Sequence, residues 1–247
     1  MTQTVTLLCL PCAGASAVMY MRWRRLLPAW LRLVPVELPG RGARLAQAPA
    51  RDFSALVEQV AREQAGEMQG DYALFGHSMG ALLAYGLARR QAERGGPMPL
   101  ALLASASPAP GRRDPARYAD LQGDAALIAD LRKQGGTPQE LFDSPELLRL
   151  TLDVLAADYD VCRSFQDDGA RALPVPVHAL AGRDDDIEAH RIEGWPALGQ
   201  PGSTIDWFDG HHFFIRQNEA AVLRCVEDRL AAVRPFRQAA LPGCARA

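Results

Sequence analysis

The chain has 247 residues, of which 48% are hydrophobic and 23% are charged, and its formal net charge is −2. This length suffices for one well-buried α/β domain, and the nearly balanced charge excludes the basic footprint of a nucleic-acid-binding protein. No apolar run approaches the roughly 18 residues of a membrane span, and the N-terminal segment lacks the basic start of a signal peptide, so we expect a cytoplasmic protein.

Six apolar segments have the lengths of buried strands, and helical periodicity recurs between them. Because these segments are apolar throughout rather than at every second residue, they predict an α/β fold with a doubly wound, mostly parallel sheet covered on both faces. Ligands of such sheets bind at the carboxyl ends of the strands. The predicted strands are residues 5–10, 33–38, 72–75, 100–106, 175–181 and 204–208, and the clearest helices are residues 52–64, 79–93 and 219–233.

The loop after the first strand, "LPCAGAS", has small residues around Gly14. Such a loop can approach a substrate carbonyl and supply one of the two backbone donors of an oxyanion hole. We assign this donor to the amide of Ala13 or Cys12, and the second to the amide of Met79. The alternative is an ordinary tight turn.

A C-x-x-C motif, Cys9 and Cys12, overlaps the first strand. It is compatible with a redox pair or half of a metal site, but neither a second such motif nor a nearby histidine pair accompanies it. Cysteine within an apolar strand acts as a small hydrophobe, and five cysteines, an odd number, predict free thiols rather than a disulfide framework. We therefore expect no metal.

After the third strand, Ser78 stands between Gly76 and Gly80 in "GHSMG". This spacing matches the nucleophile elbow G-x-S-x-G, a sharp turn from strand to helix in which both glycine positions lie too close to other backbone for side chains. We predict that Ser78 is a nucleophile. The alternative is a plain turn whose serine caps the following helix.

About 70 residues separate the fourth and fifth strands, whereas a crossover connection needs only about 12. This insert contains amphipathic helices, one of them with Ser144 as N-cap and Pro145 at the first helical position. Within a single domain of residues 1–233, we predict a lid over residues about 110–170; the alternative is a helical hairpin packed elsewhere. Residues 234–247 are predicted to be a flexible tail.

Carboxylates and imidazoles follow the last two strands, in the chain order Ser, Asp, His of α/β hydrolases. "GRDDDIEAH" follows the fifth strand, and "DGHHFF", with His211 and His212, follows the sixth. The loops alone leave open which aspartate and which histidine would act, and a surface histidine pair is the alternative. The other three histidines are expected elsewhere: packed in the fold for His77, in a buried strand for His178, and exposed for His190.

Several motifs occur together in the order found in one family. They are "LPCAGAS", "ELPGRGAR", "FGHSMG", "GGTPQEL", "DSPELL", "AADY", "GRDD" with Trp195 ten residues past Asp185, and "FDGHHFF". Over most of residues 5–230 the chain thus resembles the type II thioesterases of nonribosomal peptide and polyketide synthesis. The resemblance implies an α/β-hydrolase that removes stalled or wrong acyl and aminoacyl groups from the phosphopantetheine arms of carrier proteins, without a metal or organic cofactor.

The resemblance also implies the residue roles: Ser78 as nucleophile, Asp185 as acid and His212 as base. Two positions depart from the family pattern. His211 stands where the family usually has glycine, which places a second imidazole where it can crowd the site or compete as base. Ala15 replaces the second glycine of the usual "AGG". The alternatives are a general carboxylesterase with the same machinery and a binding protein that has lost catalysis.

Arginines occur in two segments that the fold predicts near the mouth of the site. They are Arg41 and Arg44 after the second strand, and Arg112, Arg113 and Arg117 where the lid begins. One interpretation is a surface that steers an acidic carrier protein to the site; the other is an ordinary solvated charged surface.

Overall fold

The computed structural model describes residues 4–166 and 169–234. Within them, a six-stranded sheet has the order β2-β1-β3-β4-β5-β6, and every neighbouring pair of strands is parallel. The strands are β1 (Val5–Leu10), β2 (Leu31–Pro35), β3 (Tyr72–His77), β4 (Leu102–Ser105), β5 (Val177–Gly182) and β6 (Thr204–Phe208). The predicted parallel α/β sheet is confirmed, and its carboxyl ends form one common edge.

The second strand begins and ends earlier than predicted. It covers Leu31–Pro35 rather than residues 33–38, and its register with β1 runs from Val5 opposite Leu31 to Cys9 opposite Pro35. The apolar run reports burial, and burial continues past the last paired residue, since Val36 and Leu38 are both buried after the strand. The bounds of the strand are set by its hydrogen bonds to β1, and an apolar sequence does not show which residues form them.

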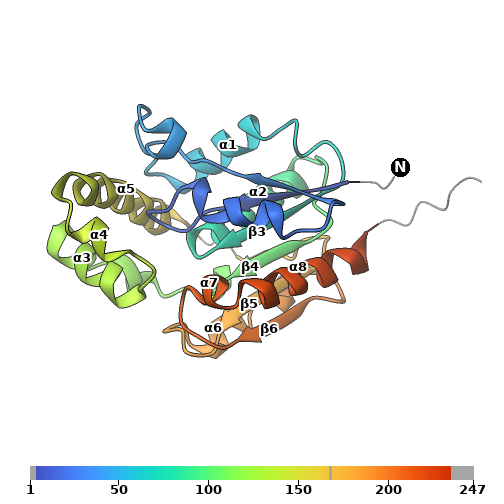
Figure 1. The fold of residues 1–247 in the computed structure, drawn as a ribbon. Coiled ribbons are helices and arrows are strands. Elements are labelled where there is room, and N and C mark those ends of the chain that lie inside the picture. Colours follow the sequence, from blue (N-terminus) through green and yellow to red (C-terminus); the bar gives the residue numbers. More distant parts are fainter. Residues whose placement is uncertain (1–3, 167–168, 235–247) are drawn as a thin grey trace, which may run out of the picture.

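Helices cover both faces of the sheet (Figure 1). One face packs against α1 (Phe53–Glu63) and α2 (Met79–Glu93), and the other against the 3₁₀ helix η1 (Ala17–Arg25) and α8 (Glu219–Val233). Successive strand residues point to opposite faces, so that Leu8 and Leu10 of β1 join the first cluster, while Leu7 and Cys9 join the second. Both faces are therefore apolar, as the uninterrupted hydrophobic runs predict.

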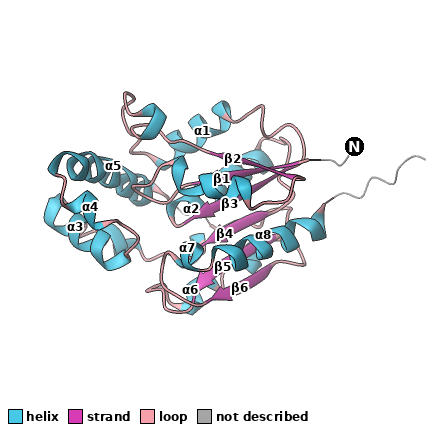
Figure 2. Ribbon diagram, in the orientation of Figure 1, coloured by secondary structure: helices cyan, strands magenta, loops and turns pink. Residues whose placement is uncertain are grey.

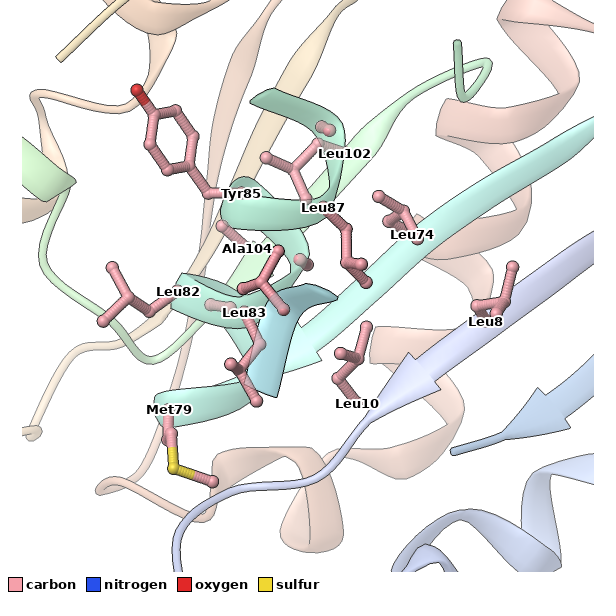
Figure 3. Packing of buried hydrophobic residues seen from close by; sticks show 14 of the residues in the cluster. Leu8, Leu10, Leu74, Met79, Leu82, Leu83, Tyr85, Leu87, Leu102 and Ala104 are labelled. Carbon is pink, nitrogen blue, oxygen red and sulfur yellow. The ribbon is translucent and has the colours of Figure 1, made fainter. Parts of the chain in front are cut away.

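The helix that follows Ser78 is packed on nearly all sides. Of the 15 residues of α2, 11 are buried. Leu82, Leu83 and Leu87 belong to the same apolar cluster as Leu74 and Leu102 of the neighbouring strands, and Figure 3 shows Leu87 near these two. Such packing holds the start of the helix, and with it the turn that carries Ser78, at a defined place on the sheet.

Between β4 and β5 the chain forms helices that lie together at one end of the sheet (Figures 1 and 2). They are η3 (Pro110–Arg112), η4 (Pro115–Tyr118), α3 (Gly123–Gln134), α4 (Gln139–Phe142) and α5 (Pro145–Ser164), and we call residues 110–164 the lid segment. Leu127 of α3 packs against Leu152, Leu155 and Tyr159 of α5 in a small separate cluster. As predicted, α5 begins with Pro145, after Ser144 as its N-cap.

The remaining elements are short. They are η2 (Gly42–Arg44), α6 (Ala189–Ile192), η5 (Pro196–Leu198) and α7 (Phe214–Gln217). In the part of the chain that the structure describes, no helix is long and apolar enough to cross a membrane. The predicted tail, residues 234–247, lies outside the described residues except for Arg234.

Candidate active site

Ser78 lies in a strained turn between β3 and α2, with φ 56° and ψ −117°. The backbone crowding predicted around it is confirmed: a Cβ added at Gly76 would lie 2.0 Å from the carbonyl oxygen of Gly80, and one at Gly80 would lie 2.1 Å from that of Leu10. The Ser78 hydroxyl forms no capping hydrogen bond with α2 among the described residues. The turn therefore presents the hydroxyl at the carboxyl end of the sheet instead of using it in the helix.

Asp185 and His212 contact each other across two neighbouring loops. Nδ1 of His212 lies 3.0 Å from Oδ2 of Asp185, and the two side chains are only 13% and 6% exposed. An ionised carboxylate only accepts hydrogen bonds, so this contact puts the imidazole proton on Nδ1 and leaves Nε2 free to act as a base. The loops come this close because Gly182, at the end of β5, has no side chain: a Cβ there would lie 2.5 Å from the carbonyl oxygen of Gly210.

The neighbouring candidates have other partners. The carboxylate of Asp184 accepts the Gly210 amide at 3.1 Å, and its carbonyl oxygen accepts Nδ1 of His211 at 2.7 Å. Asp186 is exposed and pairs with Lys133 of the lid segment at 2.7 Å. Among the alternatives that the sequence left open, the structure thus joins Asp185 to His212 and uses Asp184 and His211 to hold their loops together.

Two positions where the family usually has glycine tolerate side chains here. Among the described residues, the non-glycine residues with positive φ are Ser78 and Ala106. Ala15 and His211 therefore adopt backbone conformations that do not require glycine, whereas Gly14, with φ 74°, is in the left-handed region that favours it.

His77 lies beneath the imidazole of His212. It is fully buried, its Nδ1 is 2.9 Å from Oγ of Ser105, and its ring centroid is 5.3 Å from that of His212. Burial, together with the charges of His212 and Arg216, lowers the pKa of His77 well below its ordinary value, so it remains neutral. The predicted packing role is confirmed, but only the tertiary structure reveals that it packs against His212.

Three other residues noted in the sequence lie apart from this contact. His178 is buried in β5 with Nδ1 2.9 Å from Oγ1 of Thr204, and His190 is exposed on α6, both as predicted. Trp195 is fully buried and donates its indole hydrogen to the Ser107 carbonyl at 2.7 Å. Trp195 thereby fixes the backbone that follows β4, part of which borders the cavity.

A cavity of about 450 Å³ opens between the strand ends and the lid segment. Its wall contains all five predicted site residues: Ala13, Ser78, Met79, Asp185 and His212. The lid segment contributes Arg113 and Arg117, which the sequence predicted near the mouth of the site. It also contributes side chains that the sequence did not predict there: Asp114, Tyr118, Lys133, Gln134, Tyr159 and Cys162. Helical spacing showed that this segment is amphipathic, but no pattern in it shows which side chains line the cavity.

The loop of residues 12–15 has two of its amides already paired. The amide of Ala15 donates to the Cys12 carbonyl at 3.1 Å, and the amide of Gly14 donates to Oδ2 of Asp158 at 2.8 Å. The predicted donors, Ala13 or Cys12, are the other two amides of this loop. Met79 is the first residue of α2, where the helix itself offers no acceptor to its amide.

The cysteines of the described residues, Cys9, Cys12, Cys162 and Cys225, are free thiols, and Cys244 lies outside that part. Burial raises the pKa of Cys12 to about 12 and also raises that of Cys9, so both are protonated thiols at neutral pH. Among the described residues, no group of three or more His, Cys, Asp or Glu side chains is arranged to hold a metal ion.

The arginines predicted near the mouth do not form one solvated surface. Arg41 is only 6% exposed and bonds a buried carboxylate, so its placement in such a surface was wrong: a partner distant in sequence draws it inside. Arg44 pairs with a glutamate of α1, Arg113 donates to a lid carbonyl at 2.9 Å, and Arg117 pairs with a buried aspartate at 3.0 Å. Arg112 is exposed.

The chain matches one family model and several individual proteins over most of its length. A family model described as the thioesterase domain matches residues 5–230. Thioesterase PikA5 of Streptomyces venezuelae is 31% identical over 232 residues, which cover 93% of this chain and 82% of that protein. LgrE of Brevibacillus parabrevis is 32% identical over 222 residues, 88% of this chain and 84% of that protein, although it bears the name linear gramicidin dehydrogenase.

The solved structure of BorB, described as the type II thioesterase from the borrelidin biosynthetic cluster, superimposes with a TM-score of 0.84. It is 34% identical, and the match covers 93% of this chain and 94% of BorB. The α/β-hydrolase fold that the sequence predicted is thereby confirmed.

Proposed function

The chain belongs to the thioesterase family, whose members are thioester hydrolases, and on that premise we propose that it is a serine thioesterase acting on acyl and aminoacyl groups bound to carrier proteins. Its place would be the editing of nonribosomal peptide or polyketide assembly lines. The observation that carries the proposal is the joint placement of Ser78, His212 and Asp185 on the wall of one cavity beneath the lid segment. The relationship to a type II thioesterase supports the carrier-bound substrate.

Catalysis is assigned to Ser78, His212 and Asp185. Nε2 of His212 takes the hydroxyl proton as the Ser78 oxygen attacks the thioester carbonyl, and the carbon–sulfur bond then breaks. The imidazolium of His212 gives this proton to the sulfur of the departing pantetheine thiolate, which leaves as the thiol. It next activates a water molecule, which hydrolyses the acyl-serine ester. Asp185, at 3.0 Å from Nδ1, holds the required tautomer and stabilises the imidazolium that forms twice in each cycle.

The negative charge of each tetrahedral intermediate needs two donors that are already in place. We assign these to the backbone amides of Met79 and Ala13, both of which border the cavity beside Ser78. Preorganised donors in a site shielded from water stabilise the developing oxyanion without a reorganisation cost. The reaction drawn this way requires no metal or organic cofactor.

The dehydrogenase name of LgrE does not carry over. A dinucleotide-binding turn has three glycines, in the pattern G-x-G-x-x-G, directly after the first strand. The corresponding turn here, "LPCAGAS", has only Gly14, and the amide of Gly14 already donates to an aspartate side chain.

A general carboxylesterase uses the same three catalytic residues, so comparing thioester with oxygen-ester substrates is the decisive test.

Carrier-bound substrate is tested by intact-mass measurement of carrier proteins loaded with different acyl groups. We expect the protein to convert acyl-carrier to free phosphopantetheinyl carrier, and to prefer thioesters over oxygen esters with the same acyl group. A strong preference for the oxygen ester, with loaded carriers left intact, would support the carboxylesterase instead. No turnover of either substrate, without a serine adduct from a fluorophosphonate, would support a binding protein.

Among the three consecutive aspartates, Asp185→Asn is expected to lower kcat by about 10³- to 10⁴-fold, since an amide favours the wrong imidazole tautomer. Asp186→Asn, at an exposed side chain paired with Lys133, should change kcat by less than about threefold. Asp184→Asn should have an intermediate effect, because that carboxylate accepts the Gly210 amide but does not contact His212. Steady-state kinetics of the three isosteric variants provides the comparison, and a larger loss at Asp184 than at Asp185 would refute the assignment of the acid.

A further inference from the structure

A buried ion pair joins the lid segment to the chain that follows β2. Arg41 binds Asp158 of α5 with both terminal nitrogens, Nη1 to Oδ2 at 2.6 Å and Nη2 to Oδ1 at 2.7 Å, and the side chains are 6% and 1% exposed. Removing two charges from water costs about as much free energy as their mutual attraction returns, so a buried pair is a poor device for stability alone. What else the pair contacts is therefore informative.

Both partners bind the backbone of the loop that carries the proposed oxyanion donor. Oδ2 of Asp158 accepts the Gly14 amide at 2.8 Å, and Nη1 of Arg41 donates to the Ala15 carbonyl at 3.2 Å. Leu155, one turn before Asp158 on α5, approaches the same loop: a Cβ added at Gly14 would lie 3.3 Å from its Cδ1. The loop is thus held through its amide, its carbonyl and a van der Waals contact.

We propose that Asp158 and Arg41 are positioning residues that aim the Ala13 amide at the oxyanion of the reacting thioester, an inference that rests on the proposed function. The bond from Asp158 fixes the peptide plane between Ala13 and Gly14, and so limits how the adjoining Ala13 amide can rotate. An oxyanion donor is effective only when it is in place before the charge develops. Because Asp158 belongs to α5, the oxyanion hole is complete only when this lid helix is seated on the loop.

The double variant Arg41→Met, Asp158→Leu removes the Gly14 acceptor without leaving a buried charge unpaired, so the fold should be retained. We expect kcat on a small acyl-pantetheine thioester to fall about 10- to 100-fold, with KM changed less than about threefold, as when one oxyanion donor is impaired. Affinity for a trifluoromethyl ketone, whose adduct with Ser78 places an oxyanion in the hole, should fall in parallel. Thermal unfolding is measured on the same samples.

Asp158→Asn separates positioning from stability. The asparagine oxygen can still accept the Gly14 amide, but Arg41 then keeps an unbalanced buried charge. We expect a larger decrease in Tm than in the double variant, together with a smaller loss of kcat. If the pair had a purely structural role, kcat would follow Tm, and Asp158→Asn would lose more kcat than the double variant. That result would overturn the proposal.

A matched control is Arg90→Met, which removes another two-point contact, between Arg90 of α2 and Glu58 of α1 at 2.9 and 3.0 Å. It should leave kcat, KM and inhibitor affinity unchanged. Amide hydrogen exchange over residues 11–17 gives a readout independent of activity, and it should accelerate at Gly14 in the double variant but not in the control.

Undiminished kcat in a folded double variant, or unchanged exchange at Gly14, would overturn the positioning role. The Gly14 amide could exchange faster in the double variant than in the wild-type protein while the wild-type protein hydrolyses no thioester. In that case the proposed function fails, but the anchoring of the loop by Asp158 stands. The two failures are therefore distinguishable.

Discussion

Ser78→Ala is expected to lower kcat for thioester hydrolysis by at least about 10⁴-fold, because the acyl-enzyme route is closed and only substrate binding and the oxyanion hole remain. The fold should be unaffected. The turn is shaped by backbone contacts at Gly76 and Gly80, and the Ser78 hydroxyl caps nothing in α2 among the described residues. Turnover of an acyl-pantetheine thioester measures the loss of kcat. Intact-mass detection of a fluorophosphonate adduct shows whether Ser78 is the serine that reacts.

Ser54→Ala is the matched control, since Ser54 is exposed on α1. It should retain wild-type kcat and still acquire one adduct, whereas Ser78→Ala should acquire none. A Ser78→Ala variant that keeps a tenth of wild-type turnover would end the serine-nucleophile hypothesis.

His212→Ala is expected to reduce kcat by about 10⁴-fold as well, because neither the attack of Ser78 nor that of water then has a base. His211→Ala should keep most of the activity. The imidazole of His211 is exposed and its Nδ1 donates to the Asp184 carbonyl, whereas that of His212 is mostly buried and contacts Asp185. The two adjacent histidines thus have different partners despite their shared loop.

Steady-state kinetics of both variants on one thioester, with circular dichroism to verify folding, tests this difference. His211→Ala is itself the control, because it removes an imidazole from the same loop. Similar losses in the two variants would leave the base unassigned, and a greater loss at His211 would reverse the assignment.

Local features of the fold and site could be read directly from the sequence. The G-x-S-x-G spacing predicted the crowding at Gly76 and Gly80, because a turn that tight excludes Cβ atoms whatever surrounds it. Ser144 and Pro145 marked the start of α5, because capping and the missing amide hydrogen of proline act within one turn. The parallel sheet followed from strands apolar on both faces, and with it the strand ends as the place for Ser78 and the acid and base loops.

Contacts between distant segments were decided only by the tertiary structure. "DDD" and "HH" offer chemically equivalent side chains, and the meeting of Asp185 with His212 depends on how two loops cross at the close approach that Gly182 permits. Arg41 looked like a surface arginine because its partner, Asp158, is 117 residues away on a helix of the lid segment. Propensity and periodicity describe forces that act along a few residues of chain, whereas these pairings arise from the packing of whole elements, which no short stretch of sequence records.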